Sequence, residues 1–299
     1  MRAVWSFWSR PFLAHKHAIW GKPLHHLLAW GMSVEAARRH YPETVLITDR
    51  QGKKLLADRL GLPFVHVSTE LEQLADADPG WWALGKLVAY GLQDRPFVHI
   101  DTDVFLWKPL PRKLAESPVF AQCPEFHQNG GYASPADVEY AFAQEGAGLP
   151  VEWQWARSRE RTFFREENCG ILGGSQVDFL RHYARTAAGL VLRPEHAAAW
   201  SRLPDKRCYN MIVEQFFLSA CVEYHRCHPA SLYRGVWIDH VFPSWDRAFE
   251  ISHAARAGFT HLLGDMKSHP EVCRRLEERV RREDPAYFRR CEKLLADSA

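Results

Sequence analysis

Short β-favouring runs alternate with helical stretches through the first hundred residues, and this alternation restricts the possible folds most strongly. The runs are AVWSFW (3–8), TVLIT (44–48), FVHVS (64–68) and FVHI (97–100). Helical periodicity is predicted over about 23–40, 53–60 and 81–93, with turn formers at 49–52. This order predicts an α/β fold, a mostly parallel twisted sheet flanked by helices. Ligands of such sheets bind at the carboxyl ends of the strands.

The composition excludes several classes of protein. The 299 residues are 46% hydrophobic and carry 38 Lys+Arg against 36 Asp+Glu, a formal net charge of +2. Hydrophobicity of this order excludes a disordered chain, and 18 glycines exclude a collagen-like repeat. Because so small a net charge attracts neither phosphate backbones nor anionic lipid, we expect no nucleic-acid partner. Any phosphate chemistry must come from a local site.

The sequence also bears on the compartment. No stretch has the roughly 20 apolar residues that span a bilayer, so we expect no membrane span. The first residues lack the cleavage pattern of a signal peptide. The seven cysteines are an odd number without a CxxC pair, which is typical of reduced thiols. These features predict a cytoplasmic protein.

Two acids follow the fourth β-favouring run, in PFVHIDTDVF. If the strand continues, Asp101 and Asp103 share one face and can meet a single cation. Carboxylate oxygens favour Mn²⁺ or Mg²⁺, whereas the bare pair at about 4 Å would repel by roughly 4 kcal/mol near a surface. An ordinary turn after a strand, where Asp is common, also fits the triplet.

A second candidate site lies near the end of the chain, in FTHLLGDMKSHP. The imidazole of His261 can complete the ligand set of a cation, and Gly264 lets the backbone approach a phosphate. Lys267 offers a compact positive charge to a diphosphate. An ordinary surface segment would also contain these residue types.

The DxD triplet followed by HxxGxxK resembles the glycogenin-like family-8 glycosyltransferases, which use nucleotide sugars on a GT-A fold. ENCGILGG (167–174) resembles that family's Asn-x-Gly strand, and EQFF (214–217) its Asp-Gln element. The four matches keep the family's order and span residues 97–267. The resemblance implies a single GT-A-like domain, with a nucleotide-sugar-binding half over 1–110, an acceptor half over 111–269 and a helical tail over 270–299.

The resemblance also implies a role for each matching residue. The metal ligands would be Asp101, Asp103 and His261, binding Mn²⁺ or Mg²⁺. The donor, with a UDP-sugar favoured, would be bound by Lys86, Thr102, Gly264 and Lys267. The sugar and acceptor pocket would contain Asn168 and Gly170, and the catalytic position near the anomeric carbon would be Gln215 or Glu214. The implied reaction transfers a sugar to a glycan, peptide or small-molecule acceptor, and the resemblance favours retention of configuration.

Structural explanations stay open for some of these residues. An exposed helix lysine would explain Lys86, a glycine-containing buried strand would explain residues 168–170, and a helix-surface acid would explain Glu214. The chain also departs from the family, because Ser268 and His269 replace the Pro-Trp of the usual Lys-Pro-Trp ending. The implied relationship is therefore distant.

Three further features admit two interpretations each. The acceptor half contains four tryptophans whose flat rings either stack on sugars or fill the core, namely Trp153, Trp155, Trp237 and Trp245. CVEYHRCH offers a zinc set that departs from the usual spacing, namely Cys221, His225, Cys227 and His228. RSRERTFFREE (157–167) fits either a contact with an acceptor phosphate or a solvated loop.

The sequence after Pro270 predicts a charged helix that breaks at residues 284–285 and packs on Val272, Leu276 and Val280.

Other functions can be compared on the same residues. A HAD-type phosphatase requires Thr or Val where this chain has Phe105, and a dinucleotide-binding dehydrogenase requires glycines that residues 6–12 lack. A sugar nucleotidyltransferase, which uses the same metal chemistry, stays open. So does a non-catalytic sugar-nucleotide-binding protein of the same fold.

Overall fold

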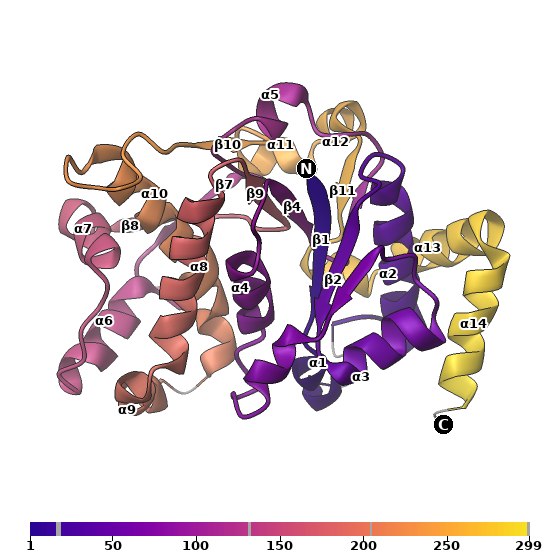
Figure 1. The fold of residues 1–299 in the computed structure, drawn as a ribbon, viewed down its shortest axis with the longest axis horizontal. Helices are drawn as coiled ribbons and strands as arrows, with labels where there is room; N and C mark the ends of the chain where they lie inside the picture. Colours follow the sequence, from indigo (N-terminus) through magenta and orange to yellow (C-terminus); the bar gives the residue numbers. More distant parts are fainter. Residues whose placement is uncertain (16–18, 131–132, 204, 298–299) are drawn as a thin grey trace. The chain divides into compact units, whose positions relative to one another are not determined.

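The structure is a computed structural model that describes residues 1–15, 19–130, 133–203 and 205–297. It contains two compact units, each assembled from separate segments of the chain (Figure 1). Unit 1 consists of Met1–Ala75, Val98–Pro109 and Ile251–Ala299, and unit 2 consists of Asp76–Phe97 and Leu110–Glu250. The division into functional halves at residues 110 and 269 stays a prediction.

Unit 1 is built on strands that follow the order β4-β1-β2-β3. Their bounds are β1 (Arg2–Phe7), β2 (Thr44–Thr48), β3 (His66–Ser68) and β4 (Phe97–Ile100), of which Phe97 itself is assigned to unit 2. β1 runs parallel to β2 and β2 parallel to β3. β2 is buried along its whole length, as expected of an apolar strand covered by helices on both faces.

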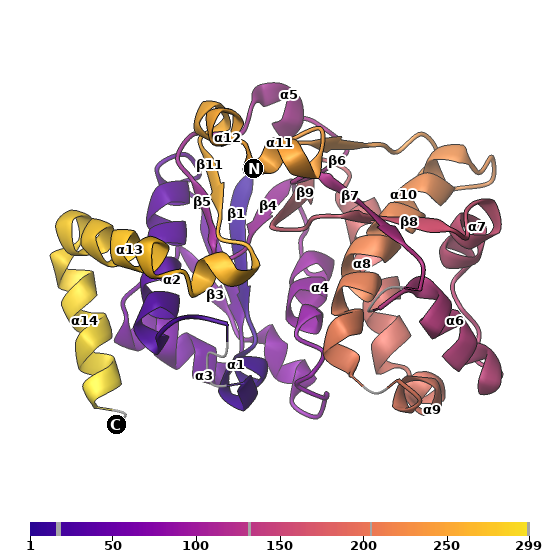
Figure 2. The same cartoon turned by 180° about the vertical axis from the view of Figure 1, so that it is seen from behind.

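An antiparallel pair of short strands completes the strands of unit 1. These are β5 (Val104–Leu106) and β11 (Phe259–His261), which lie side by side in Figure 2. The helices of unit 1 are α1 (Ser9–His15), α2 (Pro23–Arg38), α3 (Arg50–Lys53), the π-helical η1 (Lys54–Arg59), the 3₁₀ turns η2 (Glu70–Leu74) and η6 (Gly264–Lys267), α12 (Ile251–Ala257), α13 (Pro270–Glu283) and α14 (Pro285–Ala296).

Helices α13 and α14 pack against α2, which joins the last segment of the chain to the first (Figure 1). The hydroxyl of Tyr287 donates to the carbonyl of Leu27 at 2.6 Å. A Cβ atom at Gly31 would lie 2.3 Å from the Tyr287 ring, so the helices approach this closely only because Gly31 has no side chain.

Unit 2 contains strands in the order β10-β6-β9, with β10 parallel and β9 antiparallel to β6, and the separate antiparallel pair β7-β8. Their bounds are β6 (Val119–Ala121), β7 (Pro124–Gln128), β8 (Phe163–Glu167), β9 (Ile171–Gly174) and β10 (Ile238–His240). The helices are α4 (Ala83–Gly91), α5 (Arg112–Ala115), α6 (Pro135–Gln144), α7 (Val151–Arg159), α8 (Val177–Leu192), η3 (Pro194–His196), α9 (Ala197–Ser201), η4 (Lys206–Tyr209), the π-helical η5 (Ile212–Phe216), α10 (Phe217–Cys227) and α11 (Trp245–Phe249).

The expected fold class is confirmed: the chain is mixed α/β, with a mostly parallel sheet, flanking helices and a helical tail. The four predicted strands of the first hundred residues are present within two residues of their expected starts. The tail breaks at Asp284, whose side chain accepts from the backbone N–H of Tyr287 at 2.8 Å and so caps α14. None of the helices in the described ranges combines the length and apolar character needed to cross a bilayer.

Three local predictions are wrong. The segment after β2 is not a separate turn, because Asp49 accepts from the backbone N–H of Gly52 at 2.7 Å and thereby starts α3 at Arg50. ENCGILGG is not one strand, since residues 168–170 form a turn between β8 and β9. RSRERTFFREE is not a solvated loop, because it ends α7 and forms β8, and the buried Arg157 donates to Glu139 at 2.7 Å.

Candidate active site

The two acids of the DxD triplet lie in a turn and not on a continuing strand. β4 ends at Ile100, and the backbone N–H of Val104 donates to the carbonyl of Asp101 at 3.0 Å. Asp103 is buried, and Asp101 is about one-quarter exposed. The turn therefore presents two carboxylates without the alternation of an extended strand.

The pairing of β5 with β11 brings the HxxGxxK segment to this turn. Val104 is the register partner of His261, and the backbone N–H of Leu262 donates to the carbonyl of Asp103 at 2.9 Å. The imidazole Nε2 of His261 lies 3.5 Å from Oδ2 of Asp103. Nζ of Lys267, at the end of η6, lies 2.5 Å from the same oxygen. Two segments far apart in the sequence thus meet at one carboxylate.

The positive neighbours of Asp103 determine its ionisation. Burial acts to raise the pKa of this carboxyl, but the ammonium of Lys267 and the imidazole of His261 outweigh it and hold the pKa well below its ordinary value. Asp103 is therefore a carboxylate at neutral pH.

The side chains at the turn fit a divalent cation. One carboxylate oxygen each from Asp101 and Asp103 and one ring nitrogen of His261 lie within 4.8 Å of one another. Two oxygens and an imidazole suit Mn²⁺ or Mg²⁺, and the remaining coordination positions of such an ion would be available to diphosphate oxygens. The sequence prediction placed these same three residues at one site, and the structure does bring them together.

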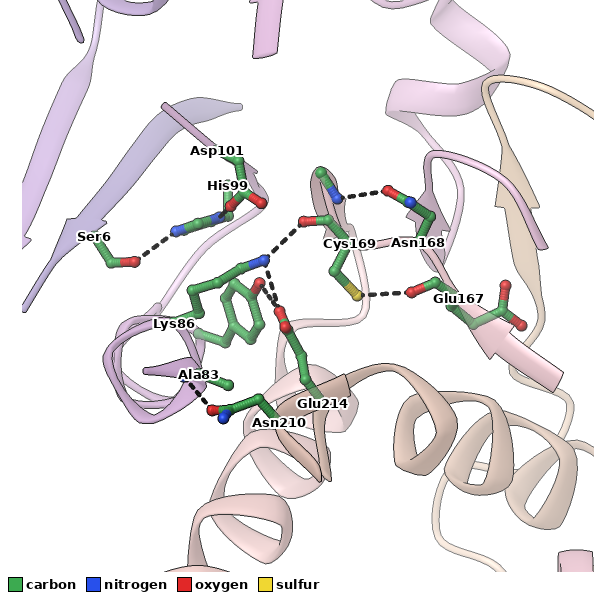
Figure 3. Close-up of polar contacts among 12 residues, drawn as sticks. Ser6, Ala83, Lys86, His99, Asp101, Glu167, Asn168, Cys169, Asn210 and Glu214 are labelled. Carbon is green, nitrogen blue, oxygen red and sulfur yellow. Dashed lines mark hydrogen bonds and ion pairs between the residues drawn. The ribbon is translucent and has the colours of Figure 1, made fainter. Parts of the chain in front are cut away.

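A buried histidine that sequence reasoning missed lies beside Asp101. Nδ1 of His99 lies 3.8 Å from Oδ1 of Asp101, and its Nε2 is hydrogen-bonded to the hydroxyl of Ser6 on β1 at 2.9 Å (Figure 3). Ser33 on α2 donates to the backbone carbonyl of Asp101 at 3.2 Å. His99 and Asp101 are two residues apart at a strand end, and that spacing was the available signal.

A second polar cluster, in unit 2, joins Lys86 to Glu214 (Figure 3). Nζ of Lys86 on α4 lies 2.8 Å from Oε1 of Glu214 on η5 and donates to the carbonyl of Cys169 at 3.0 Å. The hydroxyl of Tyr90 donates to the same Oε1 at 2.8 Å, and Tyr183 donates to the backbone carbonyl of Glu214 at 2.6 Å. The interpretations of Lys86 as an exposed lysine and of Glu214 as a surface acid are therefore wrong.

The buried carboxylate of Glu214 is only partly paired. Its side chain is fully buried, and Oε2 has no hydrogen-bond partner among the described residues. An unsatisfied oxygen in this environment costs free energy, and such groups are uncommon in folded proteins. The adjacent Gln215 is also buried.

The turn between β8 and β9 fixes Asn168. Its Oδ1 accepts from the backbone N–H of Gly170 at 3.0 Å, and its Nδ2 donates to Glu125 on β7 at 2.5 Å. Beside this pair, Nε2 of His127 lies 3.2 Å from Glu166 and 3.6 Å from Glu125. The neighbouring carboxylates of Glu125 and Glu166 raise the pKa of His127 to about 10.

The remaining predicted site residues lie as follows. Thr102 is half-buried in the turn between the two acids. Gly264 begins η6 with φ of +50°, a conformation that favours glycine, and open space surrounds the position that a Cβ would take. Trp153 belongs to the core, whereas Trp237 and Trp245 are exposed.

The alternative zinc set does not assemble. No three of Cys221, His225, Cys227 and His228 form a metal-binding group within the described residues. Cys221 is fully buried, which raises the pKa of its thiol, while Cys227 is exposed. All seven cysteines are free thiols.

Known structures offer distant likenesses. A crystal structure of the galactosyltransferase LgtC with donor and acceptor sugar analogues is 13% identical and has a TM-score of 0.38, covering 93% of this chain and 94% of that one. A nucleoside-diphosphate-sugar pyrophosphorylase from Vibrio cholerae RC9 is 12% identical with a TM-score of 0.31, covering 71% and 87%. Likenesses this distant do not decide the activity.

Sequence comparison gives a clearer assignment. No curated protein matches the chain. The sequence profile of DUF6734, described as a family of unknown function, matches residues 1–294. Because the match covers nearly the whole length, the chain belongs to the family DUF6734.

Proposed function

We propose that this protein is a metal-dependent glycosyltransferase that moves a sugar from a nucleotide diphosphate donor, with a UDP-sugar favoured, to a glycan, peptide or small-molecule acceptor. The observation that carries the proposal is the meeting of Asp101, Asp103 and His261 around one small volume, with Lys267 on the same carboxylate. The DxD triplet and the HxxGxxK segment, two of the four matches to the family-8 enzymes, both contribute to that group of side chains.

The chain's own residues would divide the work at the donor. Asp101, Asp103 and His261 would hold Mn²⁺ or Mg²⁺, and the bound cation would neutralise charge that grows on the diphosphate as the glycosidic bond breaks. Lys267 would add a compact positive charge to the leaving group. Gly264 would let backbone N–H groups approach a phosphate, because it presents no side chain. Thr102 would contribute to the same donor site.

The acceptor side of the proposal rests on Glu214 and its neighbours. Lys86 and Tyr90 hold one carboxylate oxygen of Glu214. The family-8 resemblance assigns Gln215 or Glu214 to the position near the anomeric carbon, and because both side chains are buried, either would contact a substrate only after a local opening of unit 2. Asn168 and Gly170 would line the sugar and acceptor pocket. Retention of configuration is part of the proposal because EQFF (214–217) resembles the Asp-Gln element of the family-8 enzymes.

A donor-turnover assay tests the proposed reaction. The full chain is incubated with UDP-glucose or UDP-galactose and Mn²⁺, and release of UDP is measured with and without a panel of sugar acceptors. Release that depends on Mn²⁺ and is lost in Asp103→Ala supports the proposal. Release of pyrophosphate from UTP and a sugar 1-phosphate would favour a nucleotidyltransferase instead. Binding of UDP-sugars without turnover would favour a binding protein.

A further inference from the structure

A second group of metal-ligand side chains lies within unit 2, where three helices meet. Glu152 comes from the first turn of α7, His182 from α8 and His225 from α10. α10 packs against both α7 and α8, as the two opposite views show (Figures 1 and 2). Neither the family resemblance nor the proposed glycosyl transfer uses these residues.

The three side chains converge on one carboxylate oxygen. Nε2 of His182 lies 2.7 Å from Oε1 of Glu152, and Nε2 of His225 lies 3.4 Å from the same atom. The ligand atoms of all three residues lie within 4.8 Å of one another. In a tetrahedral zinc site, bonds of 2.0–2.1 Å place neighbouring ligand atoms about 3.3 Å apart. His225 already meets this spacing, and His182 needs a shift of about half an ångström.

The orientation of His225 is set by a residue outside the group. Its Nδ1 is hydrogen-bonded to the hydroxyl of Ser231 at 2.5 Å, and Ser231 also accepts from the backbone N–H of Tyr233 at 3.0 Å. The buried Nε2 of His225 has no hydrogen-bond partner within the described ranges and points at Glu152. A metal-binding histidine is usually held by a hydrogen bond to one ring nitrogen, which leaves the other nitrogen for the ion.

The group also borders a cavity. A cavity of about 370 Å³ is lined by Glu152, His182, Arg193 and His196, among other residues of unit 2. Three protein ligands with space beside them leave a coordination position for water or a small anion, as in zinc sites that retain an open position. His182 is about one-third exposed, which gives an ion a route in, whereas Glu152 and His225 are buried.

We propose that Glu152, His182 and His225 form a binding site for a divalent transition-metal ion of the zinc class, separate from the Asp101–Asp103–His261 group. Two imidazoles and one carboxylate favour Zn²⁺ or Co²⁺ over Mg²⁺, which prefers oxygen ligands. The ion joins α7, α8 and α10, so its binding stabilises unit 2.

Titration of metal-free full-length protein with Co²⁺ and Zn²⁺ tests this site. Visible absorption reports Co²⁺ coordination, and competition with a chromophoric chelator gives the Zn²⁺ affinity. We expect one equivalent of Zn²⁺ to bind to the wild type and to raise its Tm. The same equivalent should bind to Asp103→Asn, since that variant alters only the other group of ligands.

The variants assign the ligands. His182→Ala and His225→Ala should weaken Zn²⁺ binding by at least tenfold, and Ser231→Ala by about tenfold through loss of the supporting hydrogen bond. His228→Ala and Cys227→Ser, which change other metal-binding residue types at the end of α10, should bind as the wild type does. If His225→Ala does not fold, His182→Ala and Ser231→Ala decide.

The proposal would be overturned by three outcomes. The first is no Zn²⁺ binding at about 100 µM to wild-type protein. The second is equal affinity in the wild type, His182→Ala and Ser231→Ala. The third is a loss confined to Cys227→Ser or to Asp103→Asn, which would assign the ion to a thiolate or to the other group.

Discussion

Lys267 places its ammonium 2.5 Å from Oδ2 of Asp103, although the two residues come from opposite parts of the sequence. The antiparallel pairing of β5 with β11 makes this contact possible, because it fixes His261 beside the turn and starts η6 close by. A lysine in contact with a proposed metal ligand can balance the carboxylate before an ion arrives and then contact the diphosphate. Lys267 therefore belongs to both the proposed metal site and the proposed donor site.

Removing the charge of Lys267 should impair turnover, in addition to the stability lost when the buried Asp103 carboxylate loses its cation. In Lys267→Gln, we expect Mn²⁺-dependent turnover of a UDP-sugar to fall by on the order of 10²-fold, since a preorganised positive charge is lost at the leaving group. The matched control is Lys54→Gln, at an exposed lysine of the same unit. Equal turnover in both variants would remove Lys267 from the donor site.

Breaking the Lys86–Glu214 pair should cost much of the stability of unit 2. Lys86→Met leaves the fully buried Glu214 carboxylate without its cation, and breaking such a pair typically costs about 3–5 kcal/mol. The double variant Lys86→Met/Glu214→Gln should be less destabilised than the sum of the single variants. Urea unfolding measures the four free energies, and an additive result within about 0.5 kcal/mol would show that the pair is not coupled.

The contact between Gly31 and Tyr287 predicts a strong effect of one methyl group. Gly31→Ala should lower the free energy of unfolding by about 1–3 kcal/mol, since the new Cβ would overlap the tyrosine ring that joins α14 to α2. Gly148→Ala is the control, because nothing lies within 4 Å of its Cβ position. Comparable stability in the two variants, measured by urea unfolding, would contradict this packing.

His127 predicts a pH dependence of stability. Its pKa rises from 6.5 to about 10 on folding, chiefly through the neighbouring carboxylates of Glu125 and Glu166, so its protonated form favours the folded state. The advantage of wild type over His127→Gln should be complete below about pH 6 and decline as pH rises towards 10. Urea unfolding across this range measures the difference. A difference that grows with pH would have the wrong sign.

The strands, and the convergence of Asp101, Asp103 and His261, were largely predictable from the sequence. β2 and β4 are short apolar runs with turn residues at their ends. Such runs are typical of strands that are buried on both faces of an α/β sheet. The grouping of Asp101, Asp103 and His261 was predicted from the combination of two short motifs. The expected geometry was wrong, because Asp101 and Asp103 do not share one face of a continuing strand. A turn and the β5–β11 pairing bring them to His261 instead.

The other polar contacts depend on tertiary packing that local patterns do not encode. Lys86 and Glu214 lie on different helices, and nothing in the sequence around either residue indicates that they pair. Glu152, His182 and His225 come from three helices, so no motif spacing joins them. Sequence spacing detected only CVEYHRCH, in which His225 is the one residue that belongs to the new group.

Nucleotide binding measures the central claim most directly, because it requires no knowledge of the acceptor. UDP and GDP are titrated calorimetrically into the full chain with and without Mn²⁺, and the experiment is repeated with Asp103→Ala. We predict that UDP binds only when Mn²⁺ is present and that Asp103→Ala abolishes this binding. If neither nucleotide binds under any metal condition, or if Asp103→Ala binds UDP as the wild type does, the proposed donor site is wrong.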